Sequence, residues 1–252
     1  VTEAHSYSNL LCACGAVSPD AVASVSKNSV ITGAYATLNE AIEAVMNCTA
    51  ADQAVVTILK DIDLGDGYQA IVGGVFTFDL NGFEVSSSNP GRGVLVPVSG
   101  VDITITDSGE GGKITGIWDG ISVSGSTLTI SGGTISGEYY DIYGTEYSTI
   151  ILTTGEDGVG ATFPGGITVT GATLNEILGE GAAYWQGNKM IIPAEGATEI
   201  TGGDVVIKEA CKHPGDKTYT NNGDDHTYTY TCCGLSATEA HSDSNLLCAC
   251  GA

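Results

Sequence analysis

Apolar and polar residues alternate along much of this chain, most clearly between residues 71 and 137. The alternating runs read FTFDLNGFEV, ITITDSGEGGKITG and LTISGGTISG, and glycine-rich breaks separate them. A period of two residues is typical of β-strands, because successive side chains of a strand point to opposite faces. We therefore expect strands that turn Ile, Val, Leu and Phe inward and Thr and Ser outward.

The same strands recur at a regular interval of about 25 residues, which is within the range of known structural repeats. The positions that match at this interval are Phe78, Ile103 and Leu128; Leu80, Ile105 and Ile130; Ile71, Val96 and Ile121; Val98 and Val123; Gly91 and Gly116; and Gly100 and Gly125. A repeat of this length that consists of strands and turns alone indicates a solenoid, in which each rung stacks on the one before. The prediction is an all-β fold, a parallel β-helix, whose alternation persists to about Lys208.

An amphipathic helix is predicted ahead of the solenoid, in the segment TLNEAIEAVMN. Thr37 is suited to be its N-cap and Glu40 follows three residues later, which makes a capping box. The apolar face of this helix would consist of Leu38, Ile42, Val45 and Met46. Because an open solenoid end exposes the apolar edges of a rung, we expect the helix to cap the N-terminal end.

The chain opens and closes on nearly the same peptide. TEAHSYSNLLCACGA occupies residues 2–16 and TEAHSDSNLLCACGA occupies residues 238–252, so Tyr7 and Asp243 are the one difference. Two explanations are open. A tandem array whose repeating unit runs from Thr2 to Ala237 would produce the duplication, and we favour it. The alternative is one domain with the same docking peptide at each end.

The duplication also divides the chain. We expect residues 1–16 to be part of a Cys/His module that ends a preceding repeat, residues 17–208 to be the β-helix with its cap, and residues 209–252 to be a Cys/His-rich linker module. The N-terminal peptide would then dock on a neighbouring repeat or a neighbouring chain, so that units associate head to tail. A contact of this kind that does not close on itself builds a filament.

The charge of the chain excludes some partners. Eight Lys and Arg face 30 Asp and Glu, which gives a formal net charge of −22. Such a surface repels phosphate backbones and anionic membranes, so we expect no nucleic acid as a partner. No apolar run approaches the ~20 residues that span a bilayer, so we expect no membrane span. An acidic surface suits solvation and the binding of cations.

The candidate chemistry lies in the cysteines and histidines. Seven of the 8 cysteines lie near the two ends of the chain, together with all 4 histidines, while Cys48 stands alone. Thiolate and imidazole together suit zinc better than calcium. The candidate metal ligands are His5, Cys12 and Cys14 at the front and Cys211, His213, His226, Cys232, Cys233, His241, Cys248 and Cys250 at the back.

Zinc and disulfides remain alternatives for these cysteines. A segment of ~40 residues has little core of its own, and either a zinc ion or disulfide bonds would stabilise its fold. An extracellular setting favours disulfides, although the adjacent Cys232 and Cys233 could hardly bond to each other without strain. A conceivable ligand set for zinc is His226, Cys232 or Cys233, His241, and Cys248 or Cys250.

The solenoid offers little for catalysis. No histidine lies between residues 6 and 212, and Arg92 is the single arginine, in the turn NPGRG. Asp61, Asp63 and Asp66 form the closest group of carboxylates, which is a weaker candidate for binding calcium or for hydrolysis of a glycosidic bond. We therefore expect a protein that is not an enzyme.

Two further groups of residues have structural explanations. Asp79 and Asp107 lie near strand ends and are expected to form turns. Aromatic residues gather in GEYYDIYG, with Trp118 not far away in the sequence. They favour core filling or stacking between rungs, and the alternative is a platform for a sugar ring. Binding or cleavage of carbohydrate is therefore the alternative function.

Several segments resemble a known family. VVTILKDIDL, FTFDLNGFEV and ITITDSGEGGKITG resemble the right-handed parallel β-helix (pectate-lyase-like) modules of large surface proteins of anaerobic Gram-positive bacteria, and YATLNEAIEAV resembles the helix that begins such modules. This resemblance covers residues 24–207. The tail 211–252 is similar to the short Cys/His modules that join them, although the adjacent Cys232 and Cys233 depart from the usual CxxCG or CxCG spacing.

The resemblance implies an extracellular protein on a bacterial cell surface. It would be one repeat of a tandem surface or filament protein, with a right-handed β-helix as a rigid spacer or adhesive rod. Its partners would be neighbouring repeats or copies of itself, and glycans are a further candidate.

Overall fold

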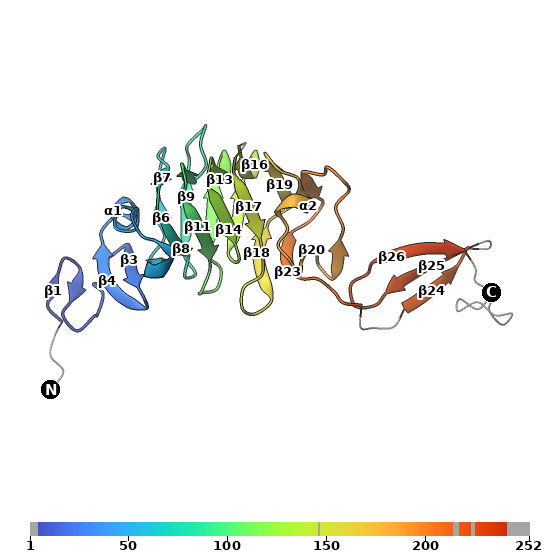
Figure 1. Cartoon of the computed structure of the whole chain (residues 1–252), viewed down its shortest axis with the longest axis horizontal. Helices are drawn as coiled ribbons and strands as arrows, with labels where there is room; N and C mark the ends of the chain where they lie inside the picture. The colour runs from blue at the N-terminus through green and yellow to red at the C-terminus, as the bar shows by residue number, and fades with distance from the viewer. Residues whose placement is uncertain (1–4, 146, 214–216, 223–224, 241–252) are drawn as a thin grey trace.

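The computed structural model describes residues 5–145, 147–213, 217–222 and 225–240. The chain is elongated, with a stack of strands in the middle, a small hairpin near the N-terminus and a separate three-stranded sheet toward the C-terminus (Figure 1). The expected positions His241, Cys248 and Cys250 lie outside the described residues.

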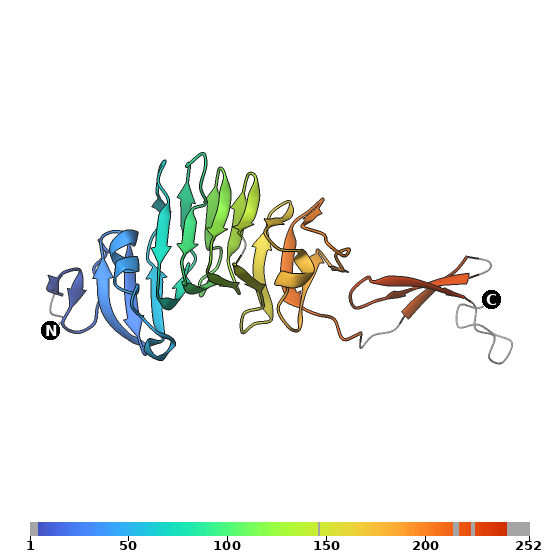
Figure 2. The same cartoon turned by 45° about the horizontal axis from the view of Figure 1, so that its top comes forward.

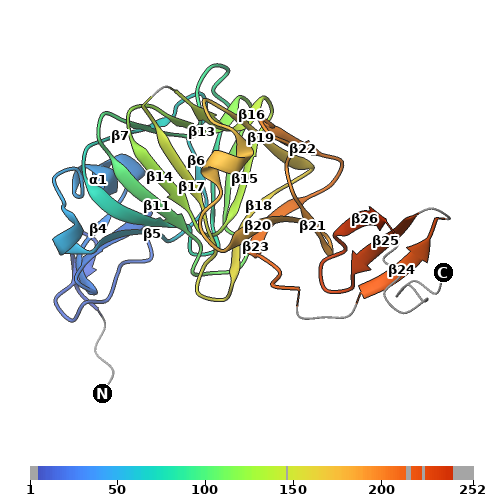
Figure 3. The ribbon, with the colours of Figure 1, turned by 45° about the vertical axis from the view of Figure 1, so that its right-hand side comes forward.

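Three sheets build the stack, a β-solenoid of about five turns. The first sheet has the order β22 (Glu199–Thr201), β19 (Gly166–Thr170), β16 (Tyr140–Gly144), β13 (Asp119–Val123), β10 (Leu95–Val98) and β7 (Gln69–Val72). The second has the order β17 (Thr149–Leu152), β14 (Thr127–Ile130), β11 (Asp102–Thr106), β8 (Val75–Asp79), β5 (Ala54–Ile58), β3 (Ala23–Lys27) and β4 (Val30–Tyr35). Figure 3 shows β11, β14 and β17 side by side.

The third sheet runs from one end of the stack to the other. Its order is β21 (Lys189–Ile191), β20 (Ala182–Gln186), β23 (Val205–Glu209), β18 (Val159–Phe163), β15 (Thr134–Gly137), β12 (Lys113–Gly116), β9 (Glu84–Ser87) and β6 (Ile62–Asp63). In the middle of all three sheets, strands of successive rungs pair in parallel, as the sequence predicts for a solenoid. The stacked rungs are easiest to follow in Figure 2.

The inward residues form one continuous core that extends from Ala23 to Ile207. Ile103 and Ile105 of β11 are fully buried, and Thr104 between them is half-buried. The alternation therefore gave the inward and outward faces of this strand correctly.

The register differs from the uniform spacing that the sequence suggests. Leu128 is the partner of Ile103 and Ile130 is the partner of Ile105, as expected, but β8 is shifted by two residues: Phe76 lies opposite Ile103 and Phe78 opposite Ile105. The proposed equivalences of Phe78 with Ile103 and of Leu80 with Ile105 are therefore wrong. The cause is the length of a connection between strands, because residues 88–94 separate β9 from β10, whereas only residues 117–118 separate β12 from β13.

A second column needs the same correction. Leu95, not Val96, is the partner of Ile121. Leu95 also pairs with Gln69, so the proposed equivalence of Val96 with Ile71 is wrong as well. Val98 forms its bridge with Ser124 rather than with Val123. Gly100 and Gly125 do meet, through a hydrogen bond of 2.8 Å from the Gly100 N–H to the Gly125 carbonyl.

The parallel stack ends before Lys208. β23 pairs antiparallel with β18 and β20, and β22 pairs antiparallel with β19. The short helix α2 (Leu174–Ile177) precedes these strands and contacts β17. Strands are thus present up to Glu209 as expected, but the last ones return along the stack instead of adding further rungs. Backbone N–H and C=O groups at that end of the sheets find partners in this way.

The helix α1 (Leu38–Glu43) forms where the sequence predicts it, and is shorter than predicted. Its capping box is present: the Glu40 N–H donates to Thr37 Oγ1 at 3.3 Å and the Thr37 N–H donates to Glu40 Oε2 at 3.2 Å. Leu38 and Ile42 are buried in the core, and the helix contacts β3, β4 and β7.

Asp79 and Asp107 are turn-forming residues, as predicted. Asp79 Oδ1 accepts hydrogen bonds from the backbone N–H groups of Asn81 at 3.1 Å and Ser108 at 2.8 Å. Asp107 accepts from the N–H groups of Gly82 at 2.7 Å and Gly112 at 2.8 Å. Each carboxylate therefore ties one turn of the solenoid to the next.

One glycine is required by close packing between rungs. Gly137 does not have a positive φ, yet a Cβ at this position would clash with the Tyr140 carbonyl oxygen and would come within 2.9 Å of the Asp119 carbonyl carbon. Gly91 also lacks a positive φ, and a Cβ there would meet nothing within 4 Å. The two glycines form a matched pair for a test of rung packing.

We expect Gly137→Ala to destabilise the protein by about 2–3 kcal/mol, because the backbone of two rungs would have to move apart. Gly91→Ala should leave stability unchanged or raise it by a few tenths of a kcal/mol, since it only restricts the unfolded chain. Chemical denaturation followed by circular dichroism measures both. Equal stability of the two variants would contradict the close approach of the rungs at Gly137.

Candidate metal centre

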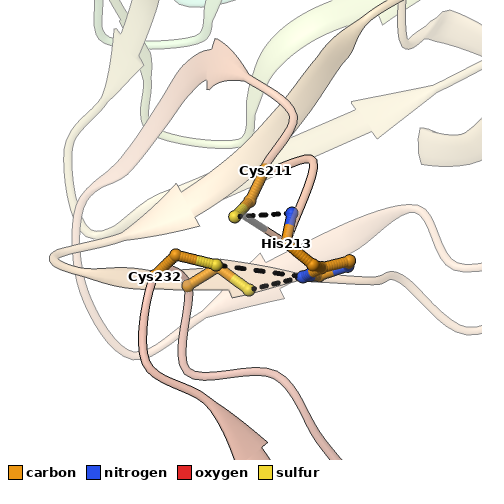
Figure 4. A group of neighbouring side chains, drawn as sticks. Cys211, His213 and Cys232 are labelled. Carbon is orange, nitrogen blue, oxygen red and sulfur yellow. Dashed lines mark hydrogen bonds between the residues drawn. The ribbon is translucent and has the colours of Figure 1, made fainter. Parts of the chain in front are cut away.

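The side chains that could bind a metal ion lie close together where the chain leaves the solenoid. Cys211 and His213 follow directly after β23, and Cys232 and Cys233 lie in the turn between β25 (Asp225–Tyr230) and β26 (Ser236–Ala240). These last two strands form a three-stranded antiparallel sheet with β24 (Lys217–Asn221). Figure 4 shows Cys211, His213 and Cys232 pointing toward one another.

The four side chains have the geometry of a metal site. One ligand atom from each lies within 4.8 Å of the others. His213 Nδ1 is 3.5 Å from the Cys233 sulfur and 3.9 Å from the Cys232 sulfur. Zinc–sulfur bonds of ~2.3 Å and zinc–nitrogen bonds of ~2.0 Å at tetrahedral angles place such atoms about 3.5–3.8 Å apart. The group can therefore close around one zinc ion with little movement.

The thiols interact with one another. Hydrogen bonding with Cys232 lowers the pKa of Cys211, and the same interaction raises the pKa of Cys232 to about 11. Loss of a proton is thus favoured at Cys211 over Cys232. A zinc ion would bind both as thiolates, because zinc binds the deprotonated form of cysteine.

The group lies in a contact between the solenoid and the three-stranded sheet. Cys233 is buried and packs with Ala183 of β20 and Met190 of β21. The Met190 N–H donates to the Cys233 carbonyl at 2.8 Å. On the other side, the Tyr230 ring of β25 stacks on the His213 ring with the centroids 4.0 Å apart. A metal ion here would hold the two parts of the chain together.

The structure divides the predicted ligands differently from the set named in the sequence analysis. Cys232 and Cys233 join Cys211 and His213, whereas His226, the other member of that set that the structure describes, does not enter the group. His226, which is 3% exposed, instead places its Nε2 3.0 Å from Glu239 Oε1. Its other proposed co-ligands, His241, Cys248 and Cys250, lie outside the described residues. The signal in the sequence for the observed pairing is the Cys-x-His spacing of Cys211 and His213.

Disulfides do not account for the described cysteines. Cys12, Cys14, Cys48, Cys211, Cys232 and Cys233 are all free thiols. The Cys12 and Cys14 sulfurs are 2.9 Å apart, which exceeds the ~2.05 Å of a disulfide bond. Within the described part of the chain, the disulfide alternative therefore has no bonded pair.

A second group lies at the other end of the molecule. His5, Cys12 and Cys14 have their ligand atoms within 4.8 Å of one another, and the His5 Nδ1 atom is 3.3 Å from the Cys14 sulfur. Hydrogen bonding, first of all with the Cys14 side chain, lowers the pKa of Cys12 to about 7. The group contains three ligands, whereas the group near the C-terminus contains four.

The other candidates do not form such groups among the described residues. Asp61, Asp63 and Asp66 do not bring their ligand atoms together. Asp61 accepts from the Glu84 N–H at 2.9 Å and Asp63 from the Gly65 N–H at 2.8 Å, so both fix backbone at turns. The guanidinium of Arg92 lies over the Tyr68 ring, 5.6 Å from its centroid. The calcium interpretation gains no support from this arrangement.

The aromatic residues form an exposed pair. The rings of Trp118 and Tyr139 have centroids 4.2 Å apart, and Tyr139 is 55% exposed. They follow β12 and β15 respectively, which are neighbouring strands of the third sheet. Stacking between rungs, which the sequence analysis favours, therefore describes this pair, although it remains on the surface.

Comparisons of the chain with protein-family models, with curated proteins and with solved structures found no match. The molecule is thus defined by its own features, a β-solenoid with a Cys/His group near each end. None of the described helices combines the length and the apolar character that crossing a membrane requires.

Proposed function

We propose that this chain is a structural, non-catalytic module of an extracellular protein, and that it serves as a rigid spacer on a bacterial cell surface or in a filament. The solenoid would be right-handed, the hand that the family resemblance implies, and α1 would cap its N-terminal end. The continuous core from Ala23 to Ile207 supports a stiff rod, because each rung is packed on its neighbours along the whole length.

The observation that carries this proposal is the position of the four-ligand group. Cys211 and His213 belong to the segment that leaves the solenoid, while Cys232 and Cys233 belong to the sheet that follows. A zinc ion bound by all four would fix the direction in which the next part of the chain continues. A spacer needs such a fixed joint, and the small apolar contact around Cys233 would not supply it alone.

The proposed assembly is head to tail, through contacts between the ends of neighbouring repeats or copies. The hairpin near the N-terminus and the three-stranded sheet lie at opposite ends of the elongated molecule (Figure 1). Copies or repeats that join through these ends would form a line of solenoids. Such an open, heterologous arrangement extends without closing.

Glycan binding is the second candidate function, and the Trp118–Tyr139 pair favours it. Exposed aromatic faces stack on sugar rings, so this surface could add adhesion to a rod. Cleavage of the glycan is not part of either proposal. Arg92 lies over the Tyr68 ring, and the groups of converging ligand atoms among the described residues consist of Cys and His, not of carboxylates. Release of unsaturated oligosaccharides from an acidic polysaccharide with calcium, lost in Arg92→Ala, would contradict a non-catalytic protein.

Small-angle X-ray scattering of the full chain tests the fixed joint. With zinc bound, we expect a single narrow distribution of maximum dimension, and after chelation a broad one, because the three-stranded sheet would then unfold and no longer be held against the solenoid. Cys211→Ser should behave like the chelated protein, and Cys48→Ala, a cysteine outside both groups, should keep the narrow distribution. A zinc-loaded chain as variable as the chelated one would contradict the proposal.

A further inference from the structure

The hairpin near the N-terminus is a separate small unit. It consists of β1 (Tyr7–Ser8) and β2 (Leu11–Cys12), which form a two-stranded sheet of their own. Its residues are absent from both apolar clusters of the described chain. Isolated two-stranded hairpins are marginally stable in water, so this one needs another source of stability.

The backbone of the hairpin brings three ligands together. Asn9 and Leu10 both have positive φ, 53° and 63°, as a two-residue hairpin turn requires. This conformation is unfavourable for Leu, by roughly 1–2 kcal/mol. Gly15, with φ of 87°, donates its N–H to the Cys12 carbonyl at 2.8 Å and so closes a second turn around Cys14. The unfavourable backbone conformation at Leu10 thus lies in the turn between β1 and β2, close in sequence to the two thiols.

The assembled group is incomplete as a tetrahedral site. Among the described residues, His5, Cys12 and Cys14 are its whole ligand set, and His5 and Cys14 are exposed. Zinc with three protein ligands keeps a fourth position that takes water or an external ligand. The four-ligand group at the other end, with Cys233 buried, is by contrast closed by the chain itself.

The second occurrence of the peptide shows which side chain lies beside the start of this sequence. Residues 238–240 repeat residues 2–4 without change, and they belong to β26, which pairs with β25. In that pairing Glu239, the counterpart of residue 3, lies opposite His226 and 3.0 Å from its Nε2 atom. Where the start of this peptide is paired with another strand, a histidine of that strand therefore lies opposite it.

We propose that the N-terminal hairpin binds one zinc ion through His5, Cys12 and Cys14, and that its fourth position is open to the imidazole of a histidine from outside the hairpin. In the chain alone, water completes the coordination. When a histidine from another module or copy replaces the water, the metal becomes a link between the two. The site is independent of the zinc joint at Cys211, so either can exist without the other.

Cobalt substitution of the full chain tests this site. Cobalt(II) occupies zinc sites and gives visible absorption that reports its ligands. The spectrum of the full chain minus that of Cys12→Ser isolates the hairpin from every other site. We expect Cys12→Ser to lose about one metal equivalent, and we expect added imidazole to shift the bands of this difference spectrum.

The duplicated peptide supplies the matched control. Cys248 occupies, in the second copy of the peptide, the position that Cys12 has in the first. Cys248→Ser should therefore retain the imidazole-dependent component that Cys12→Ser loses. His5→Ala should repeat the loss, and circular dichroism should show the solenoid unchanged in all three variants, since the hairpin lies outside the core.

Two results would overturn the proposal. If Cys12→Ser and His5→Ala retain as much metal as the full chain, the hairpin does not bind it. If the difference spectrum is present but does not respond to imidazole, the hairpin site is already complete. Neither result bears on the joint at Cys211, because that group contributes equally to both spectra and cancels.

Discussion

Ile105→Asp is expected to prevent the solenoid from folding, with a loss of stability of at least about 4–5 kcal/mol. Ile105 is fully buried in β11, an interior strand of the second sheet, with Phe78 on one side and Ile130 on the other. A carboxylate at this position would have no partner within an apolar interior. Because every rung contacts its neighbours, the damage would spread along the stack.

Thr104→Asp is the matched control, one residue away on the same strand. Thr104 is half-buried and lies between Thr77 and Thr129 on the outward face. Its substitution should cost about 1 kcal/mol or less, mainly through the low β-propensity of Asp. Urea denaturation and the yield of soluble protein measure both variants. If the two variants were tolerated equally well, the assignment of inward and outward faces in β11 would be wrong.

The fold could be predicted from the sequence to the level of a solenoid, and no further. The alternation around Ile103 and Ile105 gave the inward face, because the period of a strand depends on its own residues alone. The register depends on how many residues each turn contains. Phe76 and Phe78 alternate equally well against either register, so the pattern gives no means of choosing the correct pairing.

The antiparallel pairing of the strands at the C-terminal end of the stack could not be predicted from the sequence, for a related reason. β23 has the same alternating burial as the rungs, and a strand carries no mark of the direction in which its partner runs. The pairing of β23 with β20 results from the return of the chain after α2. The solenoid was therefore expected to extend to Lys208, although its parallel part is shorter.

The candidate site was predictable in its residue types but not in its grouping. The concentration of cysteine and histidine near the two ends indicates metal binding, and the structure shows two groups that could hold a metal ion. The choice of Cys211 and His213 as companions of Cys232 and Cys233 depends on the path from β23 and on the turn after β25. Those are tertiary features, and the spacing of the cysteines alone left the alternatives open.

Removal of zinc is expected to unfold the three-stranded sheet while the solenoid stays folded. The sheet has few buried side chains among its described residues, with His226 and Cys233 as the buried members in and beside its strands. Structural zinc supplies apparent binding free energies of about 10–16 kcal/mol in small domains, which exceeds what this sheet could gain from burial. The solenoid, in contrast, has a continuous core of its own.

Hydrogen exchange followed by mass spectrometry separates the two parts of the chain. On chelation, amides of β25 should lose their protection, whereas amides of β11 and β14 should exchange as slowly as before. The double variant Cys211→Ser, Cys232→Ser should exchange like the chelated protein even with zinc present, which assigns the effect to this group rather than to other ligands. Cys48→Ala should respond to zinc as the unmodified chain does. Protection of β25 that is the same with and without metal would mean that hydrogen bonds between strands, and not zinc, hold the sheet, and the joint at Cys211 would then lose its physical basis.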